Sequence, residues 1–154
     1  MKIKLATFSL ILSSALFMSQ NTQANEKPFA IAIHGGAGTI SKANLTPELR
    51  QAYKDKLKEA VDKGSKILEQ GGDSILAVQT AINVLENSPL FNAGVGSVYT
   101  YDGGHELDAS IMDHEFNCGS VAFLERIKHP ISLARRVMEK TPHVMLVGEG
   151  AQQF

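Results

Sequence analysis

Apolar residues recur at helical spacing through residues 46–70, and the positions between them are mostly Lys, Gln, Asp and Glu. The apolar positions are Leu49, Tyr53, Leu57, Ala60, Val61 and Leu68. This pattern predicts an amphipathic helix with one face toward a core. Thr46 provides an N-cap, Pro47 suits the first helical position, and the pair Gly71-Gly72 ends the helix.

Two further stretches repeat the helical pattern. The first follows Asp73, which can cap it, and ends near Asn87; its core-facing positions are Ile75, Val78, Ala81, Ile82 and Leu85. The second begins at Pro130 and closes at Thr141; one side of it carries Ile131, Ala134, Val137 and Met138. Because the first two helices follow each other closely, we expect them to form one layer over a sheet.

Alternating apolar positions predict the strands of that sheet. Residues 106–112 place Leu107, Ala109 and Ile111 on one face. We expect this strand to pair with residues 98–101 as a β-hairpin, closed by the glycine-containing turn at residues 102–104.

Three shorter apolar runs predict further strands. The run at residues 29–33 is a buried strand that ends in a glycine-rich turn. The others lie around residues 120–124 and at residues 144–147, and no element is predicted for residues 148–154. The order strand, two helices, several strands, helix, strand predicts a mixed α/β domain of the α+β type with a mainly antiparallel sheet.

The first 24 residues have the layout of a secretory signal peptide. Lys2 and Lys4 precede a mostly apolar stretch at residues 5–18, and a polar stretch leads to a small-residue cleavage site after Ala24. The apolar stretch is too short to cross a hydrocarbon core, which needs roughly 20 residues. We therefore expect residues 25–154 to be exported, periplasmic or secreted, with no membrane partner after signal removal.

Composition narrows the class of protein. Hydrophobic residues make up 44% and charged residues 20% of the 154 residues, which is typical of a globular protein. The formal net charge is −1, without the basic excess of a nucleic-acid binder, so we expect no nucleic-acid partner. The single cysteine, Cys118, excludes an intramolecular disulfide and is interpreted as a packed thiol rather than a nucleophile.

Polar clusters give weak signals for chemistry. His34 and the following glycines fit neither common phosphate-binding glycine template, which leaves a tight loop with exposed backbone groups. The acidic and histidine residues around 105–114 lack the spacing of a transition-metal site, so none is expected. Glu106 and Asp108 share a strand face as paired acids or, more commonly, as solvated carboxylates.

The stretch at residues 85–95 is more unusual. Pro89, Gly94 and Gly96 force an irregular path, and such a loop turns carbonyl oxygens inward, where they suit a hard cation. Asn92 is the one side chain in it that can both donate and accept hydrogen bonds. The alternative is a plain connection between a helix and a strand with a structural Asn.

Four stretches together resemble one known family. They are AIAIHGGAG at 30–38, ENSPLFNAGVGS at 86–97, HELDASIMD at 105–113 and TPHVMLVGEGA at 141–151. In this order they are similar to the plant-type asparaginases, also called isoaspartyl peptidases. The resemblance implies an N-terminal nucleophile hydrolase with an αββα sandwich. Residues 25–154 would form its amino-terminal, incomplete part, with helices on one face of a mostly antiparallel sheet.

The resemblance also implies a mechanism. In the family a precursor cleaves itself, and the Thr that then begins the second half attacks the amide of asparagine or of a β-aspartyl dipeptide, with its own α-amine as base. No catalytic cofactor is implied. The only Gly-Thr pair here, Gly38-Thr39, is followed by Ile40-Ser41 and does not match the family's Gly-Thr-Val-Gly-like motif. We therefore expect this chain to be inactive without a carboxy-terminal half, in a dimer of αβ units.

Supporting roles fall on residues that are present. By resemblance, Asn92 helps to orient the nucleophile, and the carbonyl of Gly36 approaches the nucleophile's amine. The loop at residues 85–95 is similar to the family's sodium-binding loop. The candidate ligands of a structural sodium ion are the backbone carbonyls of Leu85, Glu86, Ser88, Phe91, Ala93 and Val95.

Two other functions stay open. The chain can be a non-catalytic exported module derived from the family. It can also belong to a glycosylasparaginase-like relative, which would share the fold and the chemistry but act on another substrate.

Overall fold

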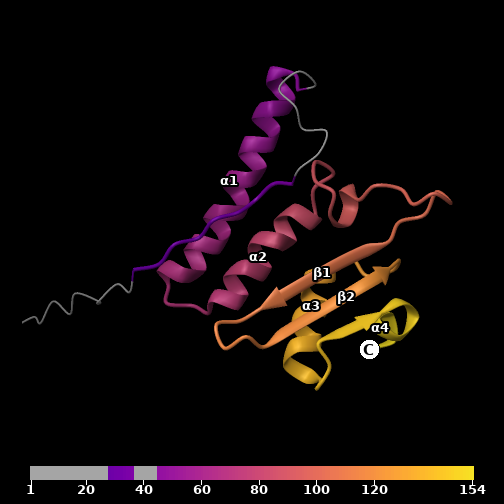
Figure 1. Cartoon of the computed structure of the whole chain (residues 1–154). Coiled ribbons are helices and arrows are strands. Elements are labelled where there is room, and N and C mark those ends of the chain that lie inside the picture. Colours follow the sequence, from indigo (N-terminus) through magenta and orange to yellow (C-terminus); the bar gives the residue numbers. More distant parts are fainter. Residues whose placement is uncertain (1–27, 37–44) are drawn as a thin grey trace, which may run out of the picture.

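The computed structural model of the chain describes residues 28–36 and 45–154 (Figure 1). The elements are helices α1 (Pro47–Glu69), α2 (Ser74–Glu86), α3 (Pro130–Lys140) and α4 (Gly148–Gln153), strands β1 (Leu107–Met112), β2 (Cys118–Leu124) and β3 (Met145–Val147), and a 3-10 turn at Gly94–Gly96. They confirm the predicted α+β class. The predicted signal peptide, residues 1–24, lies outside the described residues. Within those residues, no helix has the length and apolar character needed to cross a membrane.

The three longer helices begin and end where their capping residues predict. Thr46 Oγ1 accepts the Leu49 amide at 3.2 Å at the start of α1. Asp73 accepts the Ile75 and Leu76 amides, both at 3.3 Å, at the start of α2. Pro130 opens α3, and α3 ends at Thr141. These local bonds satisfy amide groups that a helix end leaves free, which explains why the boundaries are legible in the sequence.

Helices α1 and α2 pack side by side (Figure 1). Their shared core consists of Ala60, Ala81, Val84, Leu85 and Phe91. Gly64 lets other groups approach α1 closely, because a Cβ at this position would lie 2.6 Å from the Ile31 side chain and 3.2 Å from the Ala77 carbonyl. The close contact therefore joins the helix pair to the first described segment of the chain.

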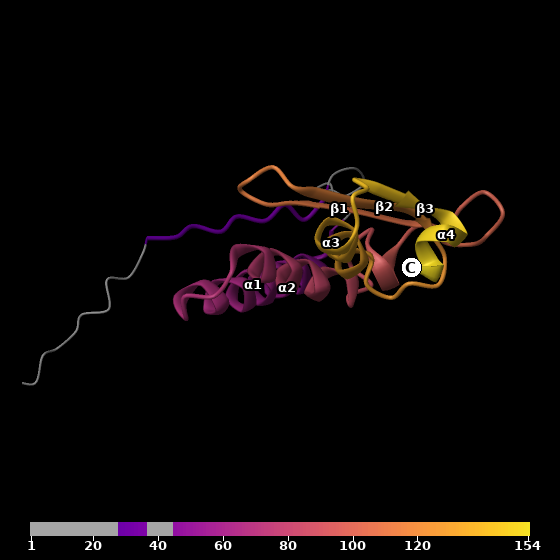
Figure 2. The same cartoon turned by 90° about the horizontal axis from the view of Figure 1, so that it is seen from below.

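That segment, residues 28–36, departs from its prediction. It is not assigned as a strand and pairs with no strand among the described residues. Ile31 and Ile33 are half-buried while their neighbours are exposed, which is the alternation of a strand. The segment runs along α1 on the side where the sheet lies (Figure 2). The predicted buried strand is thus wrong: one face of the segment packs on α1, and none of the described strands pairs with its backbone.

The predicted hairpin is also wrong. Strand β1 pairs antiparallel with β2, with Met112 opposite Cys118, and not with residues 98–101. Asp113 explains this choice, because its Oδ1 accepts the amides of Glu115 and Asn117, both at 2.9 Å, in the turn that joins β1 to β2. Residues 98–105 instead form a separate loop, closed by the bond of the Thr100 amide to the Gly104 carbonyl at 2.9 Å.

Strand β3 pairs parallel to β2, with Val121 opposite Leu146, so the three-stranded sheet in the order β1-β2-β3 is mixed rather than mainly antiparallel. The parallel pairing follows from α3, which connects β2 to β3 and carries the chain back to the same end of the sheet. Between Leu107 and Ala109 the β1–β2 register shifts. There Phe123 takes a positive φ of 57°, and its amide donates to Asp108 Oδ1 at 3.0 Å.

Helices α1, α2 and α3 lie on one side of the sheet (Figure 2). The core between sheet and helices contains Ile75, Ile111, Val121, Leu124, Ile131, Ala134, Val137 and Ala151. The opposite face of the sheet and its ends leave large apolar side chains exposed, namely Met112, Phe123, Met145 and Val147. The prediction that the helices cover one face is therefore confirmed for the described residues.

Helix α4 was not predicted. Its sequence GEGAQQ is short and has no apolar repeat, so nothing in the pattern indicates a helix. Its position depends on long-range bonds: Gln152 Oε1 accepts the amides of Glu125 at 3.0 Å and Arg126 at 2.7 Å. Arg126 also pairs with Glu149 of α4 at 2.5 Å.

Gly119 is the residue at which α3 approaches the sheet most tightly. A Cβ there would lie 2.1 Å from the Ala134 carbonyl and 2.5 Å from the Met138 amide, both backbone atoms that cannot swing aside. We expect Gly119→Ala to lower the free energy of unfolding by about 1–3 kcal/mol, measured by urea denaturation. In the matched control Gly150→Ala, nothing lies within 4 Å of the new Cβ, so stability should be unchanged or higher by up to about 1 kcal/mol. Equal effects of both changes would contradict this packing.

Candidate functional site

The connection between α2 and β1 folds into a compact loop at residues 87–97. The Ser88 amide donates to the Leu85 carbonyl at 3.0 Å, and the Gly96 amide donates to the Ala93 carbonyl at 3.1 Å. Phe91 is buried, and its ring lies nearly perpendicular to that of Tyr53 on α1, with centroids 5.5 Å apart. The loop is therefore held from both ends and by an aromatic anchor on a neighbouring helix.

Two glycines allow this loop to close on itself. A Cβ at Gly94, whose φ is 50°, would lie 2.3 Å from the Glu86 carbonyl oxygen. A Cβ at Gly96 would lie 2.2 Å from the Phe91 carbonyl oxygen and 2.8 Å from that of Ser88. Any side chain at these positions would collide with backbone atoms, so the close approach of the carbonyls requires glycine.

This geometry bears on the six carbonyls predicted as sodium ligands. The oxygens of Ser88 and Phe91 lie near one point beside Gly96, and that of Glu86 lies beside Gly94. Three of the six oxygens already accept a hydrogen bond within the loop: that of Leu85 from the Ser88 amide, that of Phe91 from the Ala93 amide, and that of Ala93 from the Gly96 amide. Carbonyl oxygens crowded beside side-chain-free positions have the chemistry that a hard cation needs, so the residues present fit such an ion.

Asn92 lies in the middle of the loop and is exposed. Its Oδ1 accepts the Val98 amide at 2.9 Å, which fixes the orientation of the side-chain amide. Within the described part of the chain, no hydrogen bond uses its Nδ2 group. Asn92 lines a cavity of about 300 Å³ together with Glu86, Ser97, Asp108, Ser110 and Ile131. The arrangement presents an oriented amide donor at the wall of a polar cavity.

The glycine-rich segment that ends at Gly36 reaches the same region. A Cβ at Gly35 would lie 3.1 Å from the Leu57 side chain and 3.5 Å from the Phe91 ring. Gly36 has a φ of 108°, a conformation that favours glycine, and its amide donates to His34 Nδ1 at 3.2 Å. The structure thus brings the segment with Gly36 to the residue beside Asn92. The end of this motif, residues 37–38, lies outside the described residues.

Glu86 is the residue of this region that sequence reasoning missed, since only its carbonyl was considered. Its side chain is nearly fully buried, with the residue 2% exposed. The carboxylate accepts the Ile131 amide at 2.9 Å and lies 3.1 Å from His129 Nδ1. Burial raises the pKa of Glu86, while these two partners favour the ionised form and oppose the rise. The one sequence signal for a role of the Glu86 side chain was its position, an acid at the end of a helix beside an apolar run.

The other polar candidates do not assemble into a site. Asp108 is occupied by the Phe123 amide. Across the part of the chain that the structure describes, no group of three or more His, Cys, Asp or Glu residues could hold a metal ion. Cys118 lies in β2 and is half-buried.

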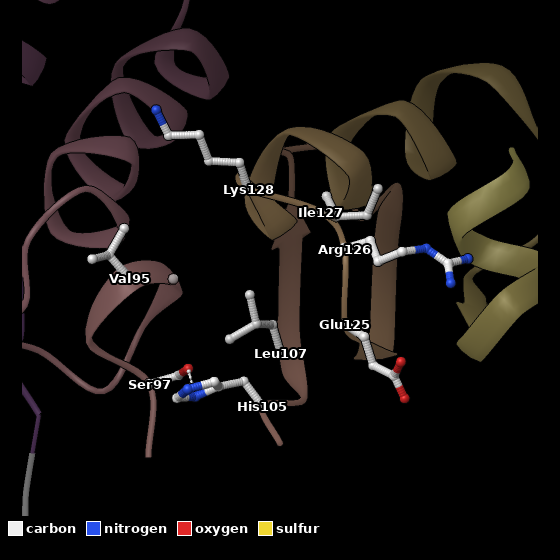
Figure 3. A pocket seen from close by; sticks show the side chains of 9 residues that line it. Val95, Ser97, His105, Leu107, Glu125, Arg126, Ile127 and Lys128 are labelled. Atoms are coloured by element: carbon white, nitrogen blue, oxygen red, sulfur yellow. Dashed lines mark hydrogen bonds between the residues drawn. The ribbon is translucent and has the colours of Figure 1, made fainter. Parts of the chain in front are cut away.

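His105 forms a contact that the sequence did not predict. Its Nδ1 lies 2.9 Å from Ser97 Oγ, and its ring lies 4.5 Å from that of Tyr99. The pair borders a second cavity of about 320 Å³ (Figure 3). Arg126 points from it toward α4, where Glu149 holds it. The pair therefore closes the loop at residues 98–104.

The model of the asparaginase family matches residues 27–154. The chain is 50% identical over 125 residues to an isoaspartyl peptidase of Salmonella typhimurium, covering 80% of this chain and 40% of that protein. It is 52% identical over 126 residues to a plant-type L-asparaginase of Pyrococcus horikoshii, covering 81% and 40%. A rat isoaspartyl peptidase/L-asparaginase is 42% identical over 125 residues, covering 80% and 36%. The chain thus spans about two fifths of the length of these curated relatives.

The buried carboxylate of Glu86 predicts a pH dependence of stability. Because its pKa is raised above 4.5 on folding, the folded state binds this proton more tightly than the unfolded state. Stabilisation by the proton is complete below pH 4.5 and is lost as the pH rises through the folded-state pKa. Between pH 4.5 and the folded-state pKa of Glu86, we expect the melting temperature of Glu86→Gln to change less with pH than that of the wild type. Glu69→Gln, at the exposed end of α1, should follow the wild type. Parallel curves for all three proteins would contradict the raised pKa.

Proposed function

The chain belongs to the asparaginase family, and from this membership we propose that it forms the amino-terminal part of an enzyme that hydrolyses L-asparagine and β-aspartyl dipeptides. The relatives carry the names isoaspartyl peptidase and L-asparaginase, which together indicate a hydrolase of amide bonds to aspartate. The observation that carries the proposal is the Asn92 amide, which Val98 orients beside the segment that contains Gly36 and whose Nδ2 donates to no group among the described residues.

The proposed nucleophile is a Thr that autoproteolysis exposes at the start of a carboxy-terminal half. A Thr hydroxyl is a weak nucleophile, and the α-amine of the same residue can act as its base. The Nδ2 group of Asn92 would donate a hydrogen bond to the attacking Thr and hold it in one rotamer. The carbonyl of Gly36 would accept from the amine. Attack on the amide carbon expels ammonia or an amine, and water then releases aspartate from the acyl-enzyme.

The proposed fold of the whole enzyme is an αββα sandwich. Two observations support it. The sheet is covered by helices on one face and leaves apolar side chains exposed on the other, as expected of a surface that meets a second sheet. The strand-like segment at residues 28–36 lies on the sheet's side of α1 and pairs with none of the described strands. A carboxy-terminal half would supply the second sheet and a partner strand for residues 28–36. The assembled αβ units would form a dimer.

Export through the signal peptide at residues 1–24 remains part of the proposal, with the periplasm or the exterior as destination. A structural sodium ion is proposed as well. It would be held by the carbonyls of the 85–95 loop, led by Ser88 and Phe91 beside Gly96. Its role would be to keep the loop, and with it Asn92, in one conformation.

Hydrolysis is tested by measuring ammonia release from L-asparagine and amine release from β-aspartyl dipeptides and glycoasparagine. We expect the 154-residue chain alone to be inactive, and a protein in which it is continued through a Gly-Thr-Val-Gly-like motif to act on the first two substrates. Preference for glycoasparagine would favour the glycosylasparaginase-like alternative. Soluble, folded protein without any turnover, from a gene that lacks the motif, would favour a non-catalytic module.

Two substitutions in the active protein separate the roles of Asn92. Asn92→Asp keeps an oxygen for the Val98 amide but loses the Nδ2 donor, whereas Asn92→Ala loses both. If the donor orients the nucleophile, both variants should lower kcat by about 10- to 100-fold. Asn87→Ala, at the exposed C-cap of α2, serves as the control. Near-normal activity of Asn92→Asp would reduce Asn92 to a structural residue of the loop.

The sodium proposal is tested by thermal denaturation at constant ionic strength. An ion that binds only the folded state raises the melting temperature as its concentration increases. We expect the wild type and Gly150→Ala to melt at a higher temperature in sodium chloride than in choline chloride. In Gly96→Ala the new Cβ would displace the carbonyls, so the rise should disappear. Identical melting temperatures of the wild type in both salts would contradict a sodium site.

A further inference from the structure

The carboxylate of Glu86 occupies a position that is unfavourable for an isolated acid. It ends α2, where the helix dipole disfavours a negative charge, and it is buried from water. Neither feature helps α2 itself, and no residue of α2 bonds to the carboxylate. The reason for its position must therefore lie in the groups that it reaches outside its own helix.

The first of these groups is the start of α3. The N-cap of α3 is His129, and its side chain makes no capping hydrogen bond within the helix. The amide of Ile131 lies in the first turn, where it has no acceptor within α3, and it donates to Glu86 Oε1 at 2.9 Å instead. His129 Nδ1 lies 3.1 Å from Glu86 Oε2. Glu86 thus acts as the cap of α3 from another helix, and both of its oxygens are used.

The second group is the loop that carries Asn92. The Glu86 carbonyl and Cα lie 2.3 and 2.8 Å from the Cβ position of Gly94, so the loop rests directly on the backbone of Glu86. Asn92 stands two residues before this contact, and Glu86, Asn92 and Ile131 line the same cavity. With no space between Glu86 and Gly94, a shift of Glu86 must shift the loop.

We propose that Glu86 is a positioning residue for Asn92: its carboxylate, anchored on the start of α3, fixes the backbone on which the Asn92 loop rests. The bond from Val98 orients the amide of Asn92 within the loop, and Glu86 sets where the loop lies relative to α3 and the sheet. The inference rests on the proposed function only for the role of Asn92, and its structural part can be measured without turnover.

Nuclear magnetic resonance of the chain tests the structural part. In Glu86→Ala we expect the side-chain amide signals of Asn92 to shift and the Ile131 and Val98 amides to exchange about tenfold faster or more. Glu86→Gln keeps an oxygen for the Ile131 amide. It should therefore restore both the Asn92 side-chain signals and the slow exchange of the two amides. If Glu86→Ala does not fold, Glu86→Asp decides, because its shorter side chain cannot reach Ile131. Unchanged Asn92 signals in the Ala or Asp variant would overturn the proposal.

Two controls separate positioning from general destabilisation. Glu69→Ala removes an acid at the equivalent end of α1, where it is exposed, and should leave the signals unchanged. Val137→Ala opens a cavity in the core under the sheet and should lower the melting temperature without moving the Asn92 signals. If Val137→Ala shifts these signals as Glu86→Ala does, the effect is one of stability and the proposal fails.

Activity of the complete protein gives a separate readout. Glu86→Ala should lower kcat about as much as Asn92→Ala, and Glu86→Gln should recover most of it. If the wild-type protein releases neither ammonia nor amine, the proposed function fails, while the resonance data still decide whether Glu86 positions Asn92. If kcat falls equally in the Gln and Ala variants while Gln restores the signals, positioning does not explain the role of Glu86 and the proposal is overturned.

Discussion

The burial of one carboxylate at the junction of α2 and α3 links the parts of this structure. The described residues contain two separate apolar clusters, one between α1 and α2 and one between α3 and the sheet. Glu86 stands between them, and an acid at this depth is tolerated only with its hydrogen bonds made. Because Ile131 supplies one of these bonds, the start of α3 must lie against the end of α2. Two more polar contacts join the same two helices. Gln79 of α2 donates to Ser132 of α3 at 2.9 Å and accepts from Arg135 of α3 at 2.9 Å. Hydrophobic burial builds each cluster, and these directional contacts set one cluster relative to the other.

The sequence predicted those features that depend on local chemistry. Thr46, Asp73 and Pro130 begin their helices through bonds or backbone preferences within a few residues, so the boundaries could be read directly. Strand pairing was different, because β1 can alternate equally well beside either neighbour. The turn at Asp113, which satisfies two amides with one carboxylate oxygen, selects β2 as its partner. Helix α4 depends on Gln152 reaching the end of β2, a contact that no local pattern contains.

The candidate site shows the same division. The family motifs identified Asn92 and Gly36, and the fold places their segments side by side through Gly35 and Phe91. The motifs could not show which carbonyls are already used by the loop's own hydrogen bonds. They also gave no indication of what the Glu86 side chain binds, because its partners lie more than 40 residues away at the start of α3. A residue's role is legible from the sequence when its partners are neighbours and hidden when they are brought together by packing.

The groups gathered around Asn92 also limit what this part of an enzyme can do. The Glu86 and Asp108 carboxylates line the same cavity as Asn92 and accept the Ile131 and Phe123 amides. The groups proposed to meet the nucleophile, the Asn92 amide and the Gly36 carbonyl, are neutral. Such groups stabilise and orient a reacting atom without being consumed, provided that they do not move when the charge develops. Rigidity is therefore their contribution, and it depends on the close contact of Gly94 with Glu86 and on the anchor of Phe91 against Tyr53. A framework of this kind accelerates a reaction only when a nucleophile enters it already aligned. The proposed Thr, as the first residue of a second half, would meet that condition only with its side-chain direction already fixed by that half.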